Sequence, residues 1–368
     1  MFPLTRIPSD IVAVSDYAAY ARTRLNDNAW VYLNSGAGDE LTLKGNRQAL
    51  DALQLRSRVL VDMQGANTQC ELWGKRYAYP MWIAPLAYQH LFHAEGESAT
   101  LQAAAAMNTP MIVSTLASTS LESLAQQAET PLWFQLYMQA DRAFTGALIQ
   151  RAEQAGYEAL VITVDAPLAG LRNQEQRAGF KLPDEVRAVN LQGMRVAHYE
   201  LEATQSLMLN GIMAHAPTWQ DIEYIKQHTK LPLVLKGITH PADALKAKAI
   251  GIDAVIVSNH GGRTLDTLAP SIQLLTPIAD CLQGDLPILW DSGIRRGTDI
   301  VKALALGATA VLIGRPVLYG LATAGALGVA HVLKILQEEL ELSMALSGCR
   351  HLAEISRDLL VDSQGLPM

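Results

Sequence analysis

The sequence predicts an α/β protein folded as a (β/α)8 barrel, and three observations indicate this fold. Eight short runs of aliphatic and β-branched residues recur along the chain, a helical pattern follows each run, and the spacing is even. The runs lack polar alternation, which is typical of strands covered on both faces in a parallel sheet. Repeated strand–helix units favour a closed TIM barrel, and a doubly wound sheet is the alternative.

The eight expected strands are short and begin after turn signals. They are Met81–Ala84, Met111–Ser114, Leu132–Leu136, Leu160–Val164, Leu233–Lys236, Ala254–Ser258, Ile288–Asp291 and Ala310–Gly314. A proline at or next to the strand start introduces four of them: Pro80, Pro110, Pro131 and Pro232.

Three signals mark where helices between the strands are expected to begin. Thr119 with Glu122, and Thr218 with Asp221, have the spacing of a capping box. Pro241 suits the first turn of another helix.

We expect a single domain over residues 1–368, with two additions to the barrel. Residues 1–80 form an N-terminal helical extension, with helical patterns at Ser15–Leu25 and Asp39–Leu53. Residues 81–341 form the barrel and residues 342–368 a C-terminal tail. A long loop, Ala166–Thr218, follows strand 4; so long a connection inside a compact barrel is usually a lid or binding loop.

Composition indicates a folded protein from a reducing, cytoplasmic compartment. Of 368 residues, 49% are hydrophobic and 18% charged, which excludes a disordered chain. The net charge of −7 argues against nucleic acid as a partner. Cys70, Cys281 and Cys349 are odd in number and scattered, which excludes a disulfide framework and a zinc ribbon. His90 and His93 have no acidic or cysteine partner nearby, so no metal site is expected.

Two uncharged stretches are long enough to cross a membrane, but both are interrupted. Pro316–Leu333 contains a proline, three glycines and a histidine, and Ala203–Gln220 contains several polar residues and a proline. We therefore expect neither stretch to span a membrane. The N-terminal residues, which include Arg6 and Asp10, do not resemble a signal peptide.

Polar side chains stand at seven of the eight strand ends. The active site of a (β/α)8 barrel lies at the carboxyl ends of its strands, so these side chains predict a ligand-filled mouth. The strand ends present Ala84-Pro85, Ser114, Gln135 and Tyr137, Thr163 and Asp165, Lys236, Ser258-Asn259-His260, Asp291, and Gly314-Arg315.

The last two strands end in a pattern that suits an anion. Asp291–Gly297 and Gly314–Pro316 place glycines where backbone N–H groups can approach a phosphate, and Arg295 and Arg315 add positive charge. This is the usual phosphate location in the fold. Each motif alone also fits an ordinary glycine turn with a solvated arginine.

The segment Ser258–Arg263 is the sharpest local signal. A histidine followed by two glycines leaves the strand in a tight turn, and Arg263 returns to the mouth. His260 is a candidate general base near neutral pH, and the alternative is a core histidine bonded to a carbonyl. Arg263 and Arg172 together are suited to holding a carboxylate.

These motifs resemble the FMN-dependent (S)-2-hydroxy acid oxidase/dehydrogenase family, which includes glycolate oxidase, lactate oxidase and mandelate dehydrogenase. The similar segments cover nearly the whole chain in the same order. They are Tyr32 with Ser35-Gly36-Ala37, Gln135–Tyr137, Thr163–Asp165, Leu235–Gly237, Ser258–Arg263 with Leu265-Asp266, Asp291–Gly297, Gly314–Pro316 and Met344–Cys349. The resemblance implies an FMN cofactor and oxidation of a 2-hydroxy acid to the 2-oxo acid, with O2 giving H2O2.

The resemblance also implies roles for individual residues. His260 takes the hydroxyl proton or the α-proton of the substrate, and whether a hydride or a carbanion follows stays open. Asp165 stabilises the protonated imidazole, and Tyr137 contacts the hydroxyl and the developing carbonyl. The implied catalytic residues are His260, Asp165, Tyr137 and Arg263, and those implied to bind substrate are Tyr32, Tyr137, Arg172, His260 and Arg263.

For the cofactor, the resemblance places Lys236 at the flavin N1–O2 edge, where its charge stabilises the anionic reduced ring. Asp291 binds the ribityl chain, and backbone groups at Gly293, Arg295, Gly314 and Arg315 hold the phosphate. The cofactor-binding residues so implied are Ala84, Pro85, Leu86, Ser114, Gln135, Thr163, Lys236, Ser258, Asp291, Ser292, Gly293, Arg295, Gly314 and Arg315.

Three positions depart from family patterns. Leu116 stands where glycolate oxidases have Trp, and Leu86 where many members have Thr. Both changes make the pocket more apolar and the first makes it roomier, so we expect a substrate larger than glycolate, from lactate to a mandelate-like acid. Ala87 lies where several dehydrogenases have Gly, which favours an oxidase. Family members form tetramers, so a homotetramer is expected.

Three alternatives stay open. The flavin could pass electrons to a membrane quinone, for which Leu207, Met208, Leu209, Ile212 and Met213 offer the candidate membrane face. The chain could be another phosphate-binding barrel, such as a nucleotide dehydrogenase or an FMN isomerase. It could also be a barrel that binds ligand without turnover, although His260, Arg263 and Tyr137 are all present.

Overall fold

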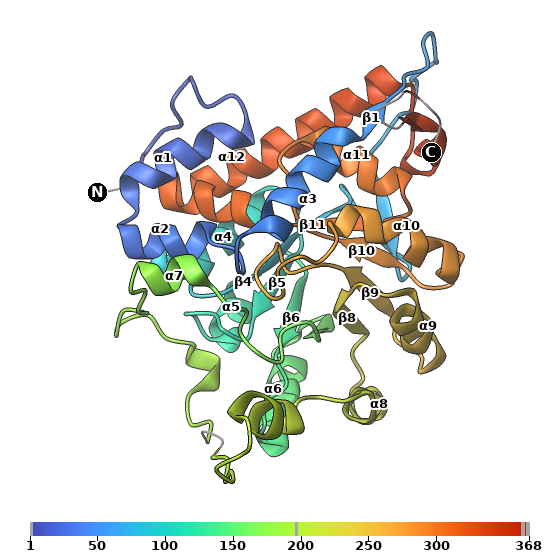
Figure 1. Ribbon diagram of the computed structural model, residues 1–368. Helices are drawn as coiled ribbons and strands as arrows, with labels where there is room; N and C mark the ends of the chain where they lie inside the picture. Colours follow the sequence, from blue (N-terminus) through green and yellow to red (C-terminus); the bar gives the residue numbers. More distant parts are fainter. Residues whose placement is uncertain (1–2, 196–197, 362–364, 366–368) are drawn as a thin grey trace.

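Eight parallel strands close into a barrel in a computed structural model that describes residues 3–195, 198–361 and 365 (Figure 1). Around the barrel the strands follow the order β10, β11, β4, β5, β6, β7, β8, β9. The strands are β4 (Met81–Leu86), β5 (Met111–Ser114), β6 (Leu132–Leu136), β7 (Ala159–Thr163), β8 (Leu233–Ile238), β9 (Ala254–Val257), β10 (Ile288–Trp290) and β11 (Ala310–Ile313). The predicted barrel is confirmed, and every strand lies within two residues of its expected bounds.

Both faces of the strands are buried, which explains their continuous apolar sequences. Side chains such as Trp82, Trp133 and Leu289 fill the inside of the barrel, while Ile83 and Phe134 pack outward under the helices. The helices that cover the barrel are α4 (Gly96–Ala106), α5 (Leu121–Gln127), α6 (Arg142–Gln154), α8 (Trp219–His228), α9 (Pro241–Ala249), α10 (Ser271–Leu282), α11 (Gly297–Ala305) and α12 (Arg315–Ser347).

Two of the three predicted helix starts are confirmed and one is wrong. Thr218 and Asp221 form the capping box of α8, and Pro241 is in the first turn of α9. Helix α5 begins after Ser120, whose side chain accepts the N–H of Ser123, and not after Thr119. The Thr119 hydroxyl instead donates to the buried carboxylate of Glu97 at 3.1 Å, a charge-assisted hydrogen bond, and Ser120 supplies the cap.

The N-terminal extension contains three helices: α1 (Tyr17–Arg24), α2 (Asp27–Asn34) and α3 (Leu41–Ala52). The first and third match the expected helical patterns, and the sequence analysis missed α2, which Asn26 caps by accepting the N–H of Ala29 at 2.8 Å. Strand β1 (Gln54–Leu55) pairs antiparallel with β12 (Leu360–Val361) near the end of the chain.

A short hairpin closes the amino end of the barrel. Its strands are β2 (Cys70–Leu72) and β3 (Lys75–Tyr77). Trp73 of the turn stacks on Trp133 with 5.2 Å between ring centroids, and Tyr77 lies 4.7 Å from the ring of Trp82. Because Trp82 and Trp133 lie near the starts of their strands, this hairpin leaves only the carboxyl end of the barrel open.

The loop between β7 and α8 lies over the carboxyl end of the barrel. Its described residues include α7 (Asn173–Arg177) and three short turns of helix: Val189–Leu191, Leu207–Ile212 and Met213–His215. Figure 1 shows α7 beside α2 of the extension. Within the loop, Leu207, Met208 and Leu209 are exposed apolar side chains.

Helix α12 alone, among the residues that the structure describes, is long and apolar enough to cross a membrane. In the structure 78% of its most apolar 18-residue window is buried, and the helix packs against α4, α11 and α1 (Figure 1). Its apolar character is therefore that of a core helix. The other uncharged stretch, 203–220, forms short turns and the start of α8.

Helix α12 is kinked at Ala324 and Gly325, whose backbone angles are not helical. The kink brings the backbone of Gly320 against that of Gly328. A Cβ added to Gly320 would lie 2.6 Å from the carbonyl oxygen of Gly328, and a Cβ on Gly328 would overlap Gly320 in turn. We expect Gly328→Ala to lower the free energy of unfolding by about 1–3 kcal/mol, because overpacking in a core is costly.

The matched control is Gly146→Ala in α6, where an added Cβ meets nothing within 4 Å. This change should raise stability by about 0.5–1 kcal/mol, because alanine is the better helix former. Thermal unfolding of both variants measures the difference. Equal midpoints for the two would contradict the proposed backbone contact.

Candidate active site

A cavity of about 390 Å³ opens at the carboxyl ends of the barrel strands, a usual size for a cofactor or substrate site. Most of the site residues expected from the sequence line it: Tyr32, Ala84, Pro85, Leu86, Ser114, Tyr137, Thr163, Arg172, Lys236, His260, Arg263, Asp291, Ser292, Gly293, Arg295, Gly314 and Arg315. Gln135, Asp165 and Ser258 do not line it. They lie behind the wall and contact residues that do.

His260 is held between an acid and a phenol. Its backbone has a φ of 58°, followed by φ values of 64° and 74° at Gly261 and Gly262, so the chain turns sharply as it leaves β9. The imidazole Nδ1 lies 3.0 Å from Asp165 Oδ1, and Nε2 lies 3.4 Å from the Tyr137 hydroxyl. Because Asp165 occupies Nδ1, Nε2 is the nitrogen that is open to a ligand.

The electrostatics of this group suit proton transfer at His260. Burial alone disfavours the charge on Asp165, but the charges of His260 and Lys236 outweigh it and lower the pKa of the carboxyl. Gly237, with a φ of 104°, permits the close approach, since a Cβ there would lie 2.5 Å from Asp165 Cβ. Burial raises the pKa of Tyr137, so this phenol stays neutral and can donate a hydrogen bond.

Two arginines that line the cavity share one carboxylate. Arg263 donates to the carbonyls of Tyr32 and Ser35, both at 2.8 Å, and to Glu175 Oε1 at 3.2 Å. Arg172 reaches the same oxygen at 3.4 Å. Burial and the charge of Arg172 lower the pKa of Arg263. Two guanidinium groups meet a single carboxylate oxygen here, so one positive charge has no carboxylate of its own. A second anion is therefore favoured here.

Glu175 is a site residue that sequence reasoning missed. It also accepts a hydrogen bond from the Ser35 hydroxyl at 2.6 Å, so it joins α7 of the loop to the end of α2. Its place three residues after Arg172 was the available signal, because residues three apart on a helix are neighbours.

Aromatic and aliphatic side chains cover the rest of the mouth. The ring of Tyr32 stacks on Phe180 of the loop at 5.0 Å and meets the edge of Tyr88 at 6.2 Å. Leu116 and Leu86 also line the cavity. The result is an apolar wall beside the arginine pair, which suits a carboxylic acid with an apolar side chain. No sequence signal identified Tyr88.

A buried lysine lies at the centre of the barrel mouth. Lys236 Nζ lies 3.0 Å from Asp291 Oδ2 and donates to the Ser258 hydroxyl at 2.8 Å. Burial alone would lower its pKa, but the charges of Asp291 and Asp165 raise it, so the ammonium is retained. Ser258 therefore contacts Lys236 from behind and also receives the N–H of His260 at 3.0 Å.

A relay of amide and hydroxyl groups crosses three neighbouring strands. Ser114 donates to Gln135 Oε1 at 3.2 Å, and Gln135 Nε2 donates to Thr163 at 2.9 Å. Gln135 is almost fully buried, and its two hydrogen bonds orient Ser114 and Thr163, which line the cavity. The wall thus presents ordered polar groups suited to a heterocyclic ring.

The ends of β10 and β11 form a positively charged part of the cavity. Arg315 donates to the carbonyls of Leu33 and Gly261, both at 3.0 Å. Burial and the nearby charge of Arg263 lower the pKa of Arg315 to about 9. A Cβ on Gly314 would meet no protein atom within 4 Å, and helix α12 begins at the next residue. Open backbone at a helix N-terminus beside arginines fits a phosphate.

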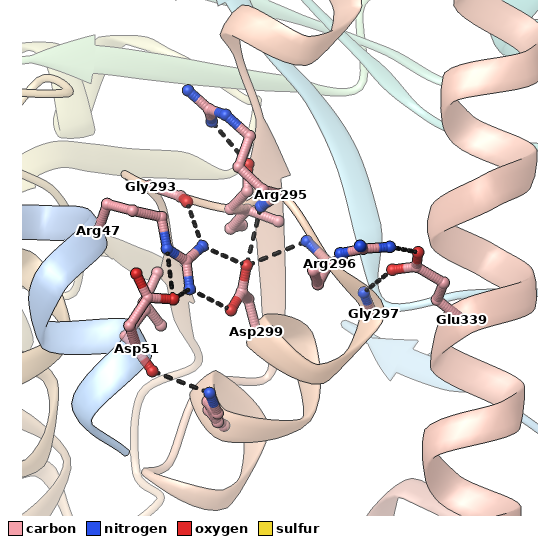
Figure 2. A network of polar contacts seen from close by, with 11 residues as sticks. Arg47, Asp51, Gly293, Arg295, Arg296, Gly297, Asp299 and Glu339 are labelled. Atoms are coloured by element: carbon pink, nitrogen blue, oxygen red, sulfur yellow. Dashed lines mark hydrogen bonds and ion pairs between the residues drawn. The ribbon is translucent and has the colours of Figure 1, made fainter. Parts of the chain in front are cut away.

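One expectation for this region is wrong in detail. The backbone N–H of Arg295 was expected to hold the phosphate, but it donates to Asp299 Oδ2 at 2.8 Å, and the N–H of Arg296 donates to the same oxygen at 3.0 Å (Figure 2). Asp299 has 1% exposure and needs these donors. The Arg295 side chain leads away from Asp299 in Figure 2, and this residue still lines the cavity.

These groups together fit FMN. Ordered hydrogen-bonding groups and an ammonium surround the centre of the mouth, and unbalanced guanidinium charge with open glycine backbone lies at one end. Those are the requirements of a polar ring and of a phosphate. Within the described residues, no three His, Cys, Asp or Glu side chains converge in a way that could hold a metal ion.

Comparison with known proteins gives one family over nearly the whole chain. Residues 21–362 match the model of the FMN-dependent dehydrogenase family. The chain is 44% identical to L-lactate oxidase from Nostoc sp., covering 97% of this chain and 100% of the relative. It is 42% identical to 4-hydroxymandelate oxidase from Amycolatopsis orientalis, covering 94% and 97%.

A solved structure of mandelate oxidase with benzoyl-formic acid is also similar. It superposes with a TM-score of 0.86 at 40% identity, covering 95% of this chain and 98% of the other. The family model, the similar relatives and the geometry of the mouth agree. The chain belongs to the FMN-dependent dehydrogenase family.

Proposed function

We propose that this enzyme oxidises an (S)-2-hydroxy acid to the 2-oxo acid, with O2 as the electron acceptor and H2O2 as the second product. The observation that carries the proposal is the position of His260 Nε2, which is backed by Asp165 through Nδ1 and lies beside Tyr137. The named relatives, a lactate oxidase and a 4-hydroxymandelate oxidase, support the reaction class and the acceptor.

The arginine pair gives the substrate its orientation. We assign the substrate carboxylate to Arg172 and Arg263, whose two charges exceed the single carboxylate of Glu175. The α-carbon and its hydroxyl then lie toward His260 and Tyr137. Tyr32, whose ring lies 5.0 Å from the Arg263 guanidinium, covers the carboxylate from the extension.

Two electrons and two protons leave the substrate in this reaction. His260 Nε2 accepts one proton, and Asp165 stabilises the imidazolium that forms. Tyr137 donates a hydrogen bond to the oxygen that becomes the carbonyl. FMN, when bound, would accept the electron pair and pass it to O2, which takes up both protons to become H2O2. The buried ammonium of Lys236, which lines the cavity, would favour negative charge on the bound ring.

The apolar wall indicates which acids fit. Leu116 and Leu86 leave room for an apolar substituent on the α-carbon and offer it no hydrogen bond. We therefore place the preferred substrate between lactate and a mandelate-like acid. A cytoplasmic homotetramer stays our expectation, which sedimentation of the purified enzyme and cell fractionation would test.

A quinone acceptor is the second candidate, and one observation favours it. Leu207, Met208 and Leu209 are 54%, 65% and 70% exposed on the loop after β7, as a membrane-facing segment would require. The neighbouring acidic residues Glu200 and Glu202 weaken the case, because anionic lipid surfaces attract basic segments.

The flavin spectrum tests the proposed reaction. Purified enzyme mixed anaerobically with (S)-lactate or (S)-mandelate should lose its visible flavin absorption, and the absorption should return on exposure to air. Bleaching that persists in air would contradict O2 as the electron acceptor and favour a quinone instead. A protein that neither contains nor takes up FMN would overturn the proposal.

Replacement of the proposed base gives a sharper test. We expect His260→Asn to lower kcat by about 10²–10⁴-fold, because general-base catalysis contributes that much. Asparagine tolerates the positive φ at this position, so the fold and the flavin spectrum should be retained. His228→Asn, on the exposed face of α8, is the control and should keep full activity. Loss of activity by less than 10-fold in His260→Asn would remove His260 from the mechanism.

Pocket size is tested at Leu116. We expect Leu116→Trp to lower kcat/KM for mandelate by about 100-fold or more, because the cavity cannot hold the phenyl ring of mandelate beside the added indole. Activity with glycolate should change by less than about 10-fold, since that substrate has no side chain to exclude. Leu245→Trp on α9, where the leucine is 45% exposed, is the control for an added indole. Equal losses for both acids would contradict the assignment of Leu116 to the substrate wall.

A further inference from the structure

The loop between β10 and α11, residues 291–296, is fixed by a side chain from the N-terminal extension. Arg47 of α3 donates through Nη1 to the carbonyl of Gly293 at 3.0 Å. The same guanidinium makes two bonds to Asp299 of α11, at 2.6 and 2.8 Å (Figure 2). Its Nε donates to Asp51 at 3.0 Å.

Asp299 links Arg47 to the part of the loop that lines the cavity. Besides Arg47, its carboxylate accepts the backbone N–H groups of Arg295 and Arg296. Arg47 and Asp299 together fix both ends of the turn. Arg47 binds the carbonyl of Gly293, and Asp299 accepts the N–H groups of Arg295 and Arg296. The Arg295 side chain leads away from this network, and its Nη1 donates to the carbonyl of Ile294 in the same turn at 2.7 Å (Figure 2).

The surrounding contacts show that α3 and this loop are fitted to one another. Ser292 and Gly293 each have a φ of 93°, a conformation that a serine adopts only when its surroundings impose it. A Cβ on Gly293 would lie 3.2 Å from the carbonyl of Asn46. Lys302 of α11 also donates to the carbonyl of Leu50 at 2.8 Å. The extension thus holds the loop at several points along α3.

We propose that Arg47 is a positioning residue for recognition of the cofactor phosphate, acting through Gly293 and Asp299 to set the direction of Arg295. This inference rests on the proposed assignment of the phosphate to the ends of β10 and β11. It adds a residue of the extension that does not line the cavity.

Two physical effects of Arg47 have to be separated. Its charge alone would attract a phosphate at a distance, whereas its forked geometry fixes the loop. Arg47→Lys keeps the charge and loses the fork, because an ammonium cannot make the bidentate pair and the carbonyl bond together. Arg47→Met loses both, and it leaves the Asp299 carboxylate buried without a cation, which is destabilising. The double variant Arg47→Met/Asp299→Asn removes that lone charge.

The experiment compares FMN with riboflavin, which lacks only the phosphate. Each full-length protein is stripped of flavin and titrated with both ligands, and flavin fluorescence gives the two Kd values. We expect about 10-fold or greater loss of FMN affinity in Arg47→Lys, Arg47→Met and the double variant, because hydrogen bonds to charged groups are lost. Riboflavin affinity should change by less than about 3-fold. General unfolding would weaken both ligands equally.

Arg296→Met is the matched control on the same loop. The Arg296 side chain pairs with Glu339 of α12 at 2.6 Å and is 51% exposed, so this change removes one charge without touching Gly293 or Asp299 (Figure 2). It should leave both affinities within about 3-fold of the parent.

The outcomes separate the two proposals. If the parent protein binds riboflavin as tightly as FMN, the phosphate assignment fails and the role of Arg47 fails with it. If the parent prefers FMN and the Arg47 variants keep that preference, only the role of Arg47 fails. If Arg47→Lys keeps the preference while Arg47→Met loses it, charge and not positioning is responsible. Equal effects of Arg296→Met and Arg47→Met would also overturn the inference.

Discussion

The mouth of this barrel depends on two guanidinium groups that bind the carboxyl end of α2. Arg263 donates to the carbonyls of Tyr32 and Ser35, and Arg315 donates to those of Leu33 and Ser35. Carbonyls at a helix C-terminus lack partners within the helix and carry partial negative charge, so arginines stabilise them well. These bonds hold the extension against the ends of β9 and β11, and together with the stacking on Phe180 they place Tyr32 at the cavity.

The same two arginines explain the preference of the mouth for anions. Their hydrogen bonds to neutral carbonyls satisfy the N–H groups, but they leave the charge uncompensated, and burial lowers both pKa values. Glu175 balances part of this charge on one side. The remainder lies where a carboxylic acid and a phosphate would bind, so one structural device supports both the anchoring of α2 and the recognition of ligands.

The fold was predictable because its signals are local, whereas several site contacts are not. Continuous apolar runs located all eight strands, and strand ends then identified most of the cavity wall. The sequence could not show that Thr119 would bond Glu97 and leave Ser120 to cap α5, because both residues are good caps. The spacing of Glu175 from Arg172 was a signal in the sequence, but its contact with Arg263, 88 residues away, forms only in the folded chain.

The order of residues around the mouth has a consequence for how the protein is made. Tyr32 comes near the beginning of the chain and Arg315 near its end, and the barrel closes only when β11 pairs with β4. Strand β4 pairs with β5 and β11, so it has both of its neighbours only after β11 has been synthesised. The N-terminal extension is therefore made long before Arg263 and Arg315, the two arginines that bind it, and it lacks those contacts during most of translation.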